Sequence, residues 1–200
     1  MSAARANWPF QKAISLAHLL RRSLTPLMLR NYDKLHLGAG PRYIPGWANL
    51  DLWGRKNLIW DLTHPLPVKR GSVRYVYTEH FVEHLSRNDC LKLLRNCRAS
   101  MASDGVLRIS TPDLRQFAEC YLRGEIPPGW GEQPPSRAFN ELTRAWGHTY
   151  IYDEADLTSL LHEAGFSRVK RVEHGISEHP ALHALEQRES QMDLIVEAQP

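Results

Sequence analysis

The chain has 200 residues, enough for one domain with a sizeable core and short for two. Apolar residues make up 42% and charged residues 24% of it, close to the averages for globular domains, which excludes a disordered or fibrous protein. No run of about 20 uncharged apolar residues occurs, so an integral membrane protein is excluded. The net charge of +3 is too small to indicate nucleic-acid binding by itself.

Residues 1–32 make a basic N-terminal extension, with no acidic residue before Asp33. Apolar residues recur at roughly helical spacing from Pro9 to Leu29, and Pro26 is expected to interrupt them, so one or two amphipathic helices are predicted. We favour a helix that covers a sheet face or acts as a lid. A basic helix lying on an anionic membrane surface is the alternative.

The rest of the chain alternates short β-like runs with helical patterns, which predicts parallel βαβ units and a doubly wound sheet. The expected strands are 34–37, 47–50, 58–60, 73–77, 106–109, 167–172 and 192–197. One helix should follow Ser86, with Asp89 completing a capping box, and end at Gly105. Another should follow Asp153 and stop at Gly165.

The stretch from residue 122 to 146 is rich in Gly and Pro and is expected to lack regular structure. Loops of this length are usually functional lids or disordered. Because the stretch carries Trp130, Phe139 and Trp146, we favour a lid or substrate loop at about residues 123–147.

Three cysteines without a Cys-x-x-Cys pair argue against a disulfide framework and against a cysteine-based zinc site. The apolar run 13–20 ends in two arginines without a small-residue cleavage site, which makes it a poor secretory signal. A reducing, cytosolic compartment is therefore expected.

A Gly-x-Gly turn follows the first expected strand, and such a turn lets a ligand approach the backbone closely. Gly38 and Gly40 form it, but the third glycine of a dinucleotide fingerprint is replaced by Tyr43. Asp51 ends the next strand, where its carboxylate could accept hydrogen bonds from both ribose hydroxyls of a nucleoside. It lies 11 residues beyond Gly40, closer than the spacing of about 20 in dinucleotide sites, which disfavours a dehydrogenase. Asp61 could reach an adenine edge or could cap a turn.

The segment from Glu79 to His84 follows an apolar strand and contains His80-x-x-Glu83-His84, the inverted zinc-peptidase pattern. Its position at the carboxyl end of a strand, where ligands bind in a doubly wound sheet, favours a cofactor- or substrate-facing role for Glu79 and His80. Packing or helix capping is the other reading, and His84 is expected to be structural. We predict no metal ligands.

Five segments stand out in chain order: residues 35–52 (LHLGAGPRYIPGWANLDL), 61–62 (DL), 73–85 (VRYVYTEHFVEHL), 105–114 (GVLRISTPDL) and 147–166 (GHTYIYDEADLTSLLHEAGF). Together they resemble the small bacterial class I S-adenosylmethionine-dependent methyltransferases. The resemblance implies that residues 33–200 form a Rossmann-like domain. Its sheet should have seven mostly parallel strands and a C-terminal antiparallel hairpin.

The resemblance also implies S-adenosylmethionine as the cofactor, with the glycine turn against its methionine part and Asp51 on the ribose. The residues expected to bind the cofactor are Gly38, Ala39, Gly40, Asp51, Leu52, Asp61, Leu62 and Glu79. The first crossover after Gly40 is shorter than an ordinary helical connection, so the contacts there are expected to differ from those of relatives.

A hydroxyl acceptor needs a base, and histidine suits that work near neutral pH. His148 is our candidate base and His80 its helper; a histidine that only holds the loop is the alternative for each. Asp113, Trp146 and Tyr150 are candidate acceptor-binding residues. The predicted function is O-methylation of a small molecule or glycan precursor. A zinc hydrolase built on the His80 motif and a non-catalytic nucleoside-binding partner protein are the alternatives.

Overall fold

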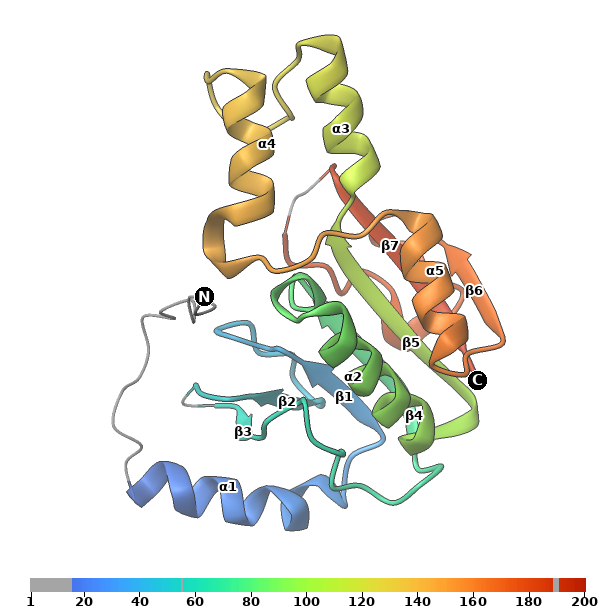
Figure 1. Ribbon diagram of the computed structural model, residues 1–200. Coiled ribbons are helices and arrows are strands. Elements are labelled where there is room, and N and C mark those ends of the chain that lie inside the picture. The colour runs from blue at the N-terminus through green and yellow to red at the C-terminus, as the bar shows by residue number, and fades with distance from the viewer. Residues whose placement is uncertain (1–15, 55, 189–190) are drawn as a thin grey trace, which may run out of the picture.

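The computed structural model describes residues 16–54, 56–188 and 191–200 and contains one seven-stranded sheet in the order β3-β2-β1-β4-β5-β7-β6 (Figure 1). Strands β1 to β5 run parallel to their neighbours, whereas β7 lies antiparallel between β5 and β6. The expected doubly wound sheet with a C-terminal antiparallel hairpin is therefore confirmed.

The strands are β1 Lys34–Leu37, β2 Ala48–Asp51, β3 Leu58–Ile59, β4 Val73–Glu79, β5 Met101–Pro112, β6 Arg168–Arg171 and β7 Asp193–Gln199. The helices are α1 Leu16–Leu29, α2 Arg87–Ser100, α3 Leu114–Arg123, α4 Pro135–Arg144 and α5 Glu154–Glu163. Three short 3-10 helices complete the structure: η1 Val82–His84, η2 Ala145–Gly147 and η3 Pro180–Leu182.

Alternation along β4 divides the core between the two faces of the sheet, because successive side chains point to opposite faces. Val76 packs in the main core, where apolar residues of α2 and α5 cover one face. Tyr77 points to the other face and packs with Ile44, Trp47 and Leu182. The second face is thus covered by the β1–β2 connection and by the segment that carries η3.

Helices α3 and α4 lie side by side beyond the carboxyl ends of β4 and β5 and form an upper lobe (Figure 1). Asp113 caps α3 by accepting from the backbone N–H of Arg115 at 3.0 Å. Helix α4 contradicts the expectation that residues 122–146 lack regular structure. Pro135 occupies its first position, where a missing N–H costs nothing, and Ala138 and Leu142 bury one face.

The end of α2 and the start of β5 differ from the prediction. Helix α2 begins after Ser86 as expected, but it ends at Ser100. Strand β5 begins at Met101, so Gly105 lies inside it. A side chain at Gly105 would lie 3.1 Å from the carbonyl oxygen of Val73 on the neighbouring strand, so glycine allows the two strands to approach closely there. The β1–β2 connection contains turns and no helix, in agreement with its shortness.

Helix α1 contacts β3, and Pro26 is accommodated inside the helix instead of ending it. The part of the expected helix between residues 9 and 15 lies outside the described residues. Among the helices that are described, none combines the length and apolar character needed to cross a bilayer.

Candidate functional site

The glycine turn and Asp51 form one hydrogen-bonded unit at the carboxyl ends of β1 and β2. Gly40 donates its backbone N–H to Asp51 Oδ2 at 2.8 Å, and Asn57 donates to the Gly40 carbonyl at 2.7 Å. Burial raises the pKa of Asp51, while hydrogen bonds from the backbone N–H groups of Gly40, Leu52 and Trp53 act in the opposite direction. Asp51 thus orients the turn as well as presenting a carboxylate there.

The two glycines of the turn serve different purposes. Both have left-handed backbones, with φ of 65° at Gly38 and 51° at Gly40. A side chain at Gly38 would overlap the ring of Phe81, whereas one at Gly40 would meet none of the described residues within 4 Å. Gly38 is therefore needed for packing, and the open approach to the backbone lies at Gly40.

Other residues expected near the cofactor have mixed surroundings. Ala39 and Leu62 are buried, and Leu52 is exposed beside Asp51. Asp61 accepts from the N–H and hydroxyl of Thr63 at 3.0 and 2.7 Å and lies 3.2 Å from His64. Its carboxylate caps the turn after β3, the alternative that the sequence left open.

Glu79, at the end of β4, anchors the C-terminal segment from residue 173 to 188. Its Oε1 accepts from the backbone N–H groups of Gln187 and Arg188 at 3.0 and 2.9 Å. Its Oε2 is buried and has no hydrogen-bond partner among the described residues. Oε1 of Glu79 thus holds the C-terminal segment in place, whereas Oε2, at the end of β4, makes no hydrogen bond to the described residues.

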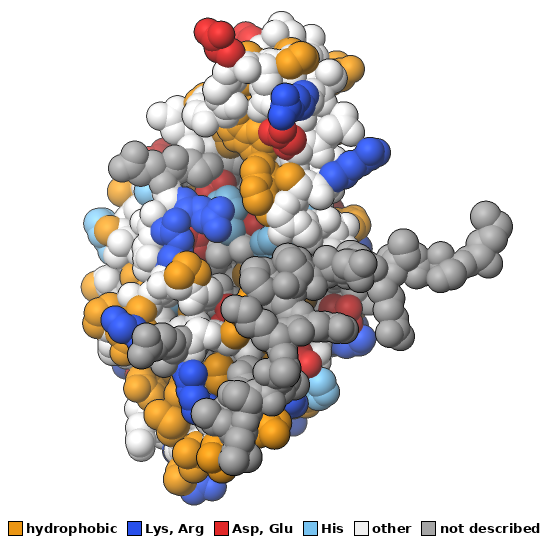
Figure 2. All heavy atoms as spheres, turned by 90° about the vertical axis from the view of Figure 1, so that its left-hand side faces the viewer, with side chains coloured by type: hydrophobic (Ala, Val, Ile, Leu, Met, Phe, Trp, Pro, Cys, Tyr) orange, Lys and Arg blue, Asp and Glu red, His pale blue; other side chains and the backbone are white. Residues whose placement is uncertain are grey.

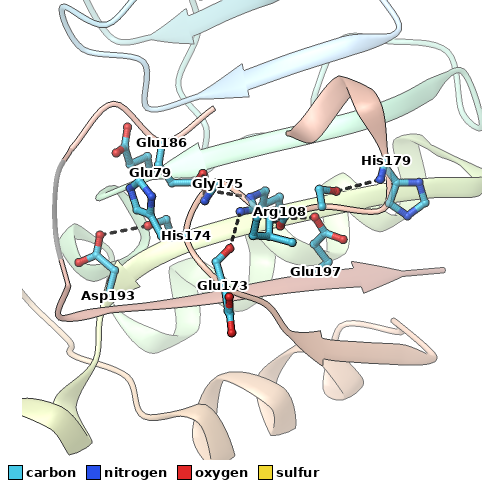
Figure 3. Close-up of polar contacts among 12 residues, drawn as sticks. Glu79, Arg108, Glu173, His174, Gly175, His179, Glu186, Asp193 and Glu197 are labelled. Carbon is cyan, nitrogen blue, oxygen red and sulfur yellow. Dashed lines mark hydrogen bonds and ion pairs between the residues drawn. The ribbon is translucent and has the colours of Figure 1, made fainter. Parts of the chain in front are cut away.

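Arg108 of β5 also binds the segment from residue 173 to 188. Its guanidinium donates to Glu186 at 2.6 Å, to Glu197 at 2.7 Å and to the carbonyl oxygens of Glu173 and Ile176 (Figure 3). The Arg108 side chain is fully buried, and unpaired buried charges are costly, so this network fixes the segment on the sheet.

A cavity of about 620 Å³ lies between the sheet edge and the upper lobe. Its lining residues are His80, His84, Pro112, Phe117, Pro128, Gly129, Trp130, Glu141, Leu142, Trp146, His148, Arg188 and Asp193. On one side of the molecule, histidine and basic side chains gather below the hydrophobic side chains of the upper lobe (Figure 2). The cavity therefore joins an apolar roof to a polar floor.

His80 forms part of the floor and is held at both ring nitrogens. Nε2 lies 2.9 Å from Asp193 Oδ2, and Nδ1 lies 3.3 Å from Glu83 Oε1, an ion-pair distance without hydrogen-bond alignment. Burial lowers the pKa of His80, but the two carboxylates outweigh it and raise the pKa to about 9. Because His80 is protonated, it is a poor base, but it can orient neighbouring groups as a cation. Its backbone has a left-handed φ of 50°, which is uncommon for a residue other than glycine.

His148 is held in the opposite state. Its Nδ1 lies 2.6 Å from the carbonyl oxygen of Leu142, which can only accept, so Nδ1 carries the proton and Nε2 the lone pair. Burial lowers the pKa of His148 below its ordinary value. His148 is thus neutral near pH 7, with the electronic form that a base or a metal ligand requires.

The other candidate residues divide between the cavity and the scaffold. Trp146, with φ of 54°, lines the cavity beside His148. Asp113 is fully buried, caps α3 and pairs with Arg171 at 2.9 Å, so its carboxylate is used by the fold. Tyr150 packs on Tyr152 and does not line the cavity.

Sequence reasoning missed several residues of the cavity. Arg188 lies in the segment before β7, and Asp193 is the first residue of β7. Only the strand order brings them close to β4. Trp130 was assigned to the expected lid without a partner, and it packs edge to face on Phe117 with ring centroids 5.0 Å apart. His84, which we expected to be structural, lines the cavity.

A sheet in this strand order, with a glycine turn after β1 and an acid after β2, is the fold of the class I S-adenosylmethionine-dependent methyltransferases. No family model matches the chain, and no curated protein matches it. Solved structures do share the fold.

A methyltransferase of this kind from Mesorhizobium loti has a TM-score of 0.51 at 17% identity, over 89% of this chain and 96% of that one. One from Thermotoga maritima has a TM-score of 0.52 at 12% identity, over 91% and 88%. A protein from Nostoc punctiforme assigned as an O-methyltransferase has a TM-score of 0.50 at 16% identity, over 90% of this chain and 56% of that one. This chain thus spans little more than half the length of the Nostoc protein, and the similarity confirms the predicted fold.

Proposed function

We propose that the protein uses S-adenosylmethionine to methylate an oxygen atom of a small molecule or glycan precursor. The observation that carries the proposal is the neutral His148, whose Nδ1–H is donated to Leu142 beside a cavity at the sheet edge where this fold binds ligands. The Mesorhizobium and Thermotoga proteins are methyltransferases that depend on this cofactor.

The residues at the ends of β1, β2 and β4 fit the cofactor. The backbone at Gly40 is open to close approach. A carboxylate has about four lone-pair positions, so Asp51 can receive ribose hydroxyls in addition to the Gly40 N–H. Glu79 Oε2 is a buried acceptor without a partner among the described residues, and the ammonium group of a bound methionine moiety is a donor of the right charge. When bound, the cofactor supplies a methyl group on a positively charged sulfur.

The chain's own residues align the acceptor and remove its proton. Direct displacement at a methyl group depends on alignment and on the exclusion of water. Trp130 and Trp146, with ring centroids 5.5 Å apart, form an apolar wall of the cavity that serves both purposes. His148 Nε2 accepts the proton of the acceptor hydroxyl. The cationic His80 orients the carboxylates of Glu83 and Asp193, with which it is paired.

The cavity limits the acceptor to a small molecule or to the end of a larger one. Its volume of about 620 Å³ lies within the usual range for small-molecule sites, about 300–1,000 Å³. The lining contains basic side chains, His80 and Arg188, and acidic ones, Glu141 and Asp193, so it offers polar contacts of both signs to the acceptor.

A calorimetric titration with S-adenosylhomocysteine tests the cofactor assignment without knowledge of the acceptor. Asp51→Asn should weaken binding about 10- to 100-fold, because it removes a charge-assisted hydrogen bond. The control Asp61→Asn should bind like the wild type, because Asp61 caps a turn. Absence of binding to the folded wild type would overturn the proposal and would equally argue against the nucleoside-binding partner alternative.

A further inference from the structure

Three side chains of metal-binding type converge at the floor of the cavity. Glu83, His84 and His148 each offer a ligand atom, and these atoms all lie within 4.8 Å of one another. Both histidines line the cavity. The set differs from the zinc-peptidase reading of the sequence, because His80 is bound to Asp193 and the segment forms a three-residue 3-10 helix, not an α-helical turn.

Backbone hydrogen bonds hold these ligands together although the two histidines lie 64 positions apart in the sequence. The carbonyl oxygen of Glu83 accepts from the N–H groups of Thr149 and Tyr150 at 2.7 and 3.1 Å. The Thr149 hydroxyl donates to the carbonyl oxygen of His84 at 3.2 Å. As a result, the rings of His84 and His148 lie with centroids 5.0 Å apart.

His148 has the supporting contact that is typical of a metal ligand. Metal-binding histidines usually donate their second ring N–H to a carbonyl or carboxylate, which fixes the ring and its tautomer. The 2.6 Å contact between His148 Nδ1 and Leu142 supplies this bond and leaves the lone pair on Nε2.

Glu83 provides a second, independent indication. Its side chain is fully buried, and Thr111 donates to Oε2 at 3.0 Å. Oε1 makes no aligned hydrogen bond among the described residues and forms an ion pair with His80 at 3.3 Å. A carboxylate has about four lone-pair positions, so Glu83 can still offer one to a cation beside the two histidines.

We propose that Glu83, His84 and His148 bind a divalent transition-metal ion. Two imidazoles and one carboxylate on one side of an ion leave further coordination positions open, here toward the cavity. Metal–ligand bonds of about 2.0–2.2 Å need ligand atoms closer together than the 4.8 Å limit that they meet here. A turn of the His84 ring would bring them closer while His148 keeps its bond to Leu142. This proposal revises the prediction of a metal-free site.

The role of the ion in methyl transfer rests on the proposed function. With an ion bound, His148 Nε2 would be a ligand and could not also act as the base. The ion would instead bind the acceptor hydroxyl and lower its pKa, so that the hydroxyl proton would be released to solvent. The oxygen's electron pair then forms the new C–O bond, while the C–S bond breaks and its electron pair returns to sulfur. The acceptor class is accordingly one whose hydroxyl, with a neighbouring oxygen, can bind a metal ion.

The test is a titration of untagged, chelator-treated protein with Co²⁺, followed by visible absorption and by calorimetry. The wild type should bind one Co²⁺ per chain and develop the absorption bands of nitrogen-ligated cobalt. His84→Ala and His148→Ala should each weaken binding at least about 100-fold, because even outer-shell changes cost 10- to 100-fold. The exposed His183→Ala, outside the cluster, is the matched control and should bind as the wild type does.

The two proposals fail separately in this design. Circular dichroism establishes that each variant is folded, and Glu83→Gln is a third probe if it folds. Cobalt binding that is absent, or unchanged in His84→Ala and His148→Ala, overturns the metal site. If S-adenosylhomocysteine still binds, His148 then returns to the role of base. Stoichiometric cobalt binding without S-adenosylhomocysteine binding leaves the metal site standing and overturns the methyltransferase proposal.

Discussion

Substituting alanine at Gly38 should destabilise the protein much more than the same change at Gly40. Both positions have left-handed φ angles, so each variant pays a backbone cost of about 1–2 kcal/mol. Only at Gly38 does the new Cβ meet a fixed neighbour, since it would overlap the Phe81 ring and lie 2.6 Å from Phe81 Cβ. Overpacking of this kind adds about 1–3 kcal/mol to the loss of unfolding free energy.

Urea unfolding followed by circular dichroism measures the difference. The midpoint of Gly38→Ala should lie below that of Gly40→Ala by on the order of 1 M urea. Gly40→Ala should instead weaken S-adenosylhomocysteine binding, because its Cβ projects into the open side of the turn. In a Phe81→Ala background the two alanine variants should differ less. Equal destabilisation of the two single variants would refute the placement of the Phe81 ring against Gly38.

Three other changes test the scaffold. Arg108→Ala should lower the unfolding free energy by about 3–5 kcal/mol in chemical denaturation, because it leaves buried carboxylates without a cation; Lys170→Ala, an exposed ion-pair variant, should change it little. Ser86→Ala removes a hydrogen bond to the first turn of α2 and should cost about 1 kcal/mol, and an unchanged melting temperature would contradict the cap. Burial lowers the pKa of His36 below its ordinary 6.5, so the unfolded chain takes up the proton first and stability falls as pH drops below 6.5. This fall should be smaller in His36→Gln, and parallel pH profiles for variant and wild type would argue against it.

The sheet could be predicted from the sequence because each strand carries its own signal. Alternation and apolar runs placed all seven strands to within a few residues, apart from the ends of β4 and β5, which extend beyond the apolar run. The upper lobe could not be predicted in the same way. Asp113 at the start of α3 was a capping signal that we assigned to the acceptor site. The Gly- and Pro-rich stretch 122–146 was expected to lack regular structure, although Pro135 begins α4.

Local sequence patterns predicted the strand ends at the site, but not the contacts between residues far apart in the sequence. The ends of β1, β2 and β4 were correctly placed at one sheet edge, since parallel strands bring their carboxyl ends together. The pairing of His80 with Asp193 joins residues 113 positions apart, and no pattern in either segment indicates it. The convergence of His84 and His148 likewise depends on hydrogen bonds from Thr149 to the η1 backbone.

The insertion of β7 between β5 and β6 has a consequence for the order of folding. Parallel strands β1 to β5 can assemble as the chain emerges, but the floor and wall of the cavity need Asp193 and Arg188, whose partners lie over 100 residues earlier. Closing loops of that length is entropically costly and slow. We expect a half-folded chain to carry the glycine turn without a formed cavity, so competence to hold an acceptor would arise only at the last step of folding.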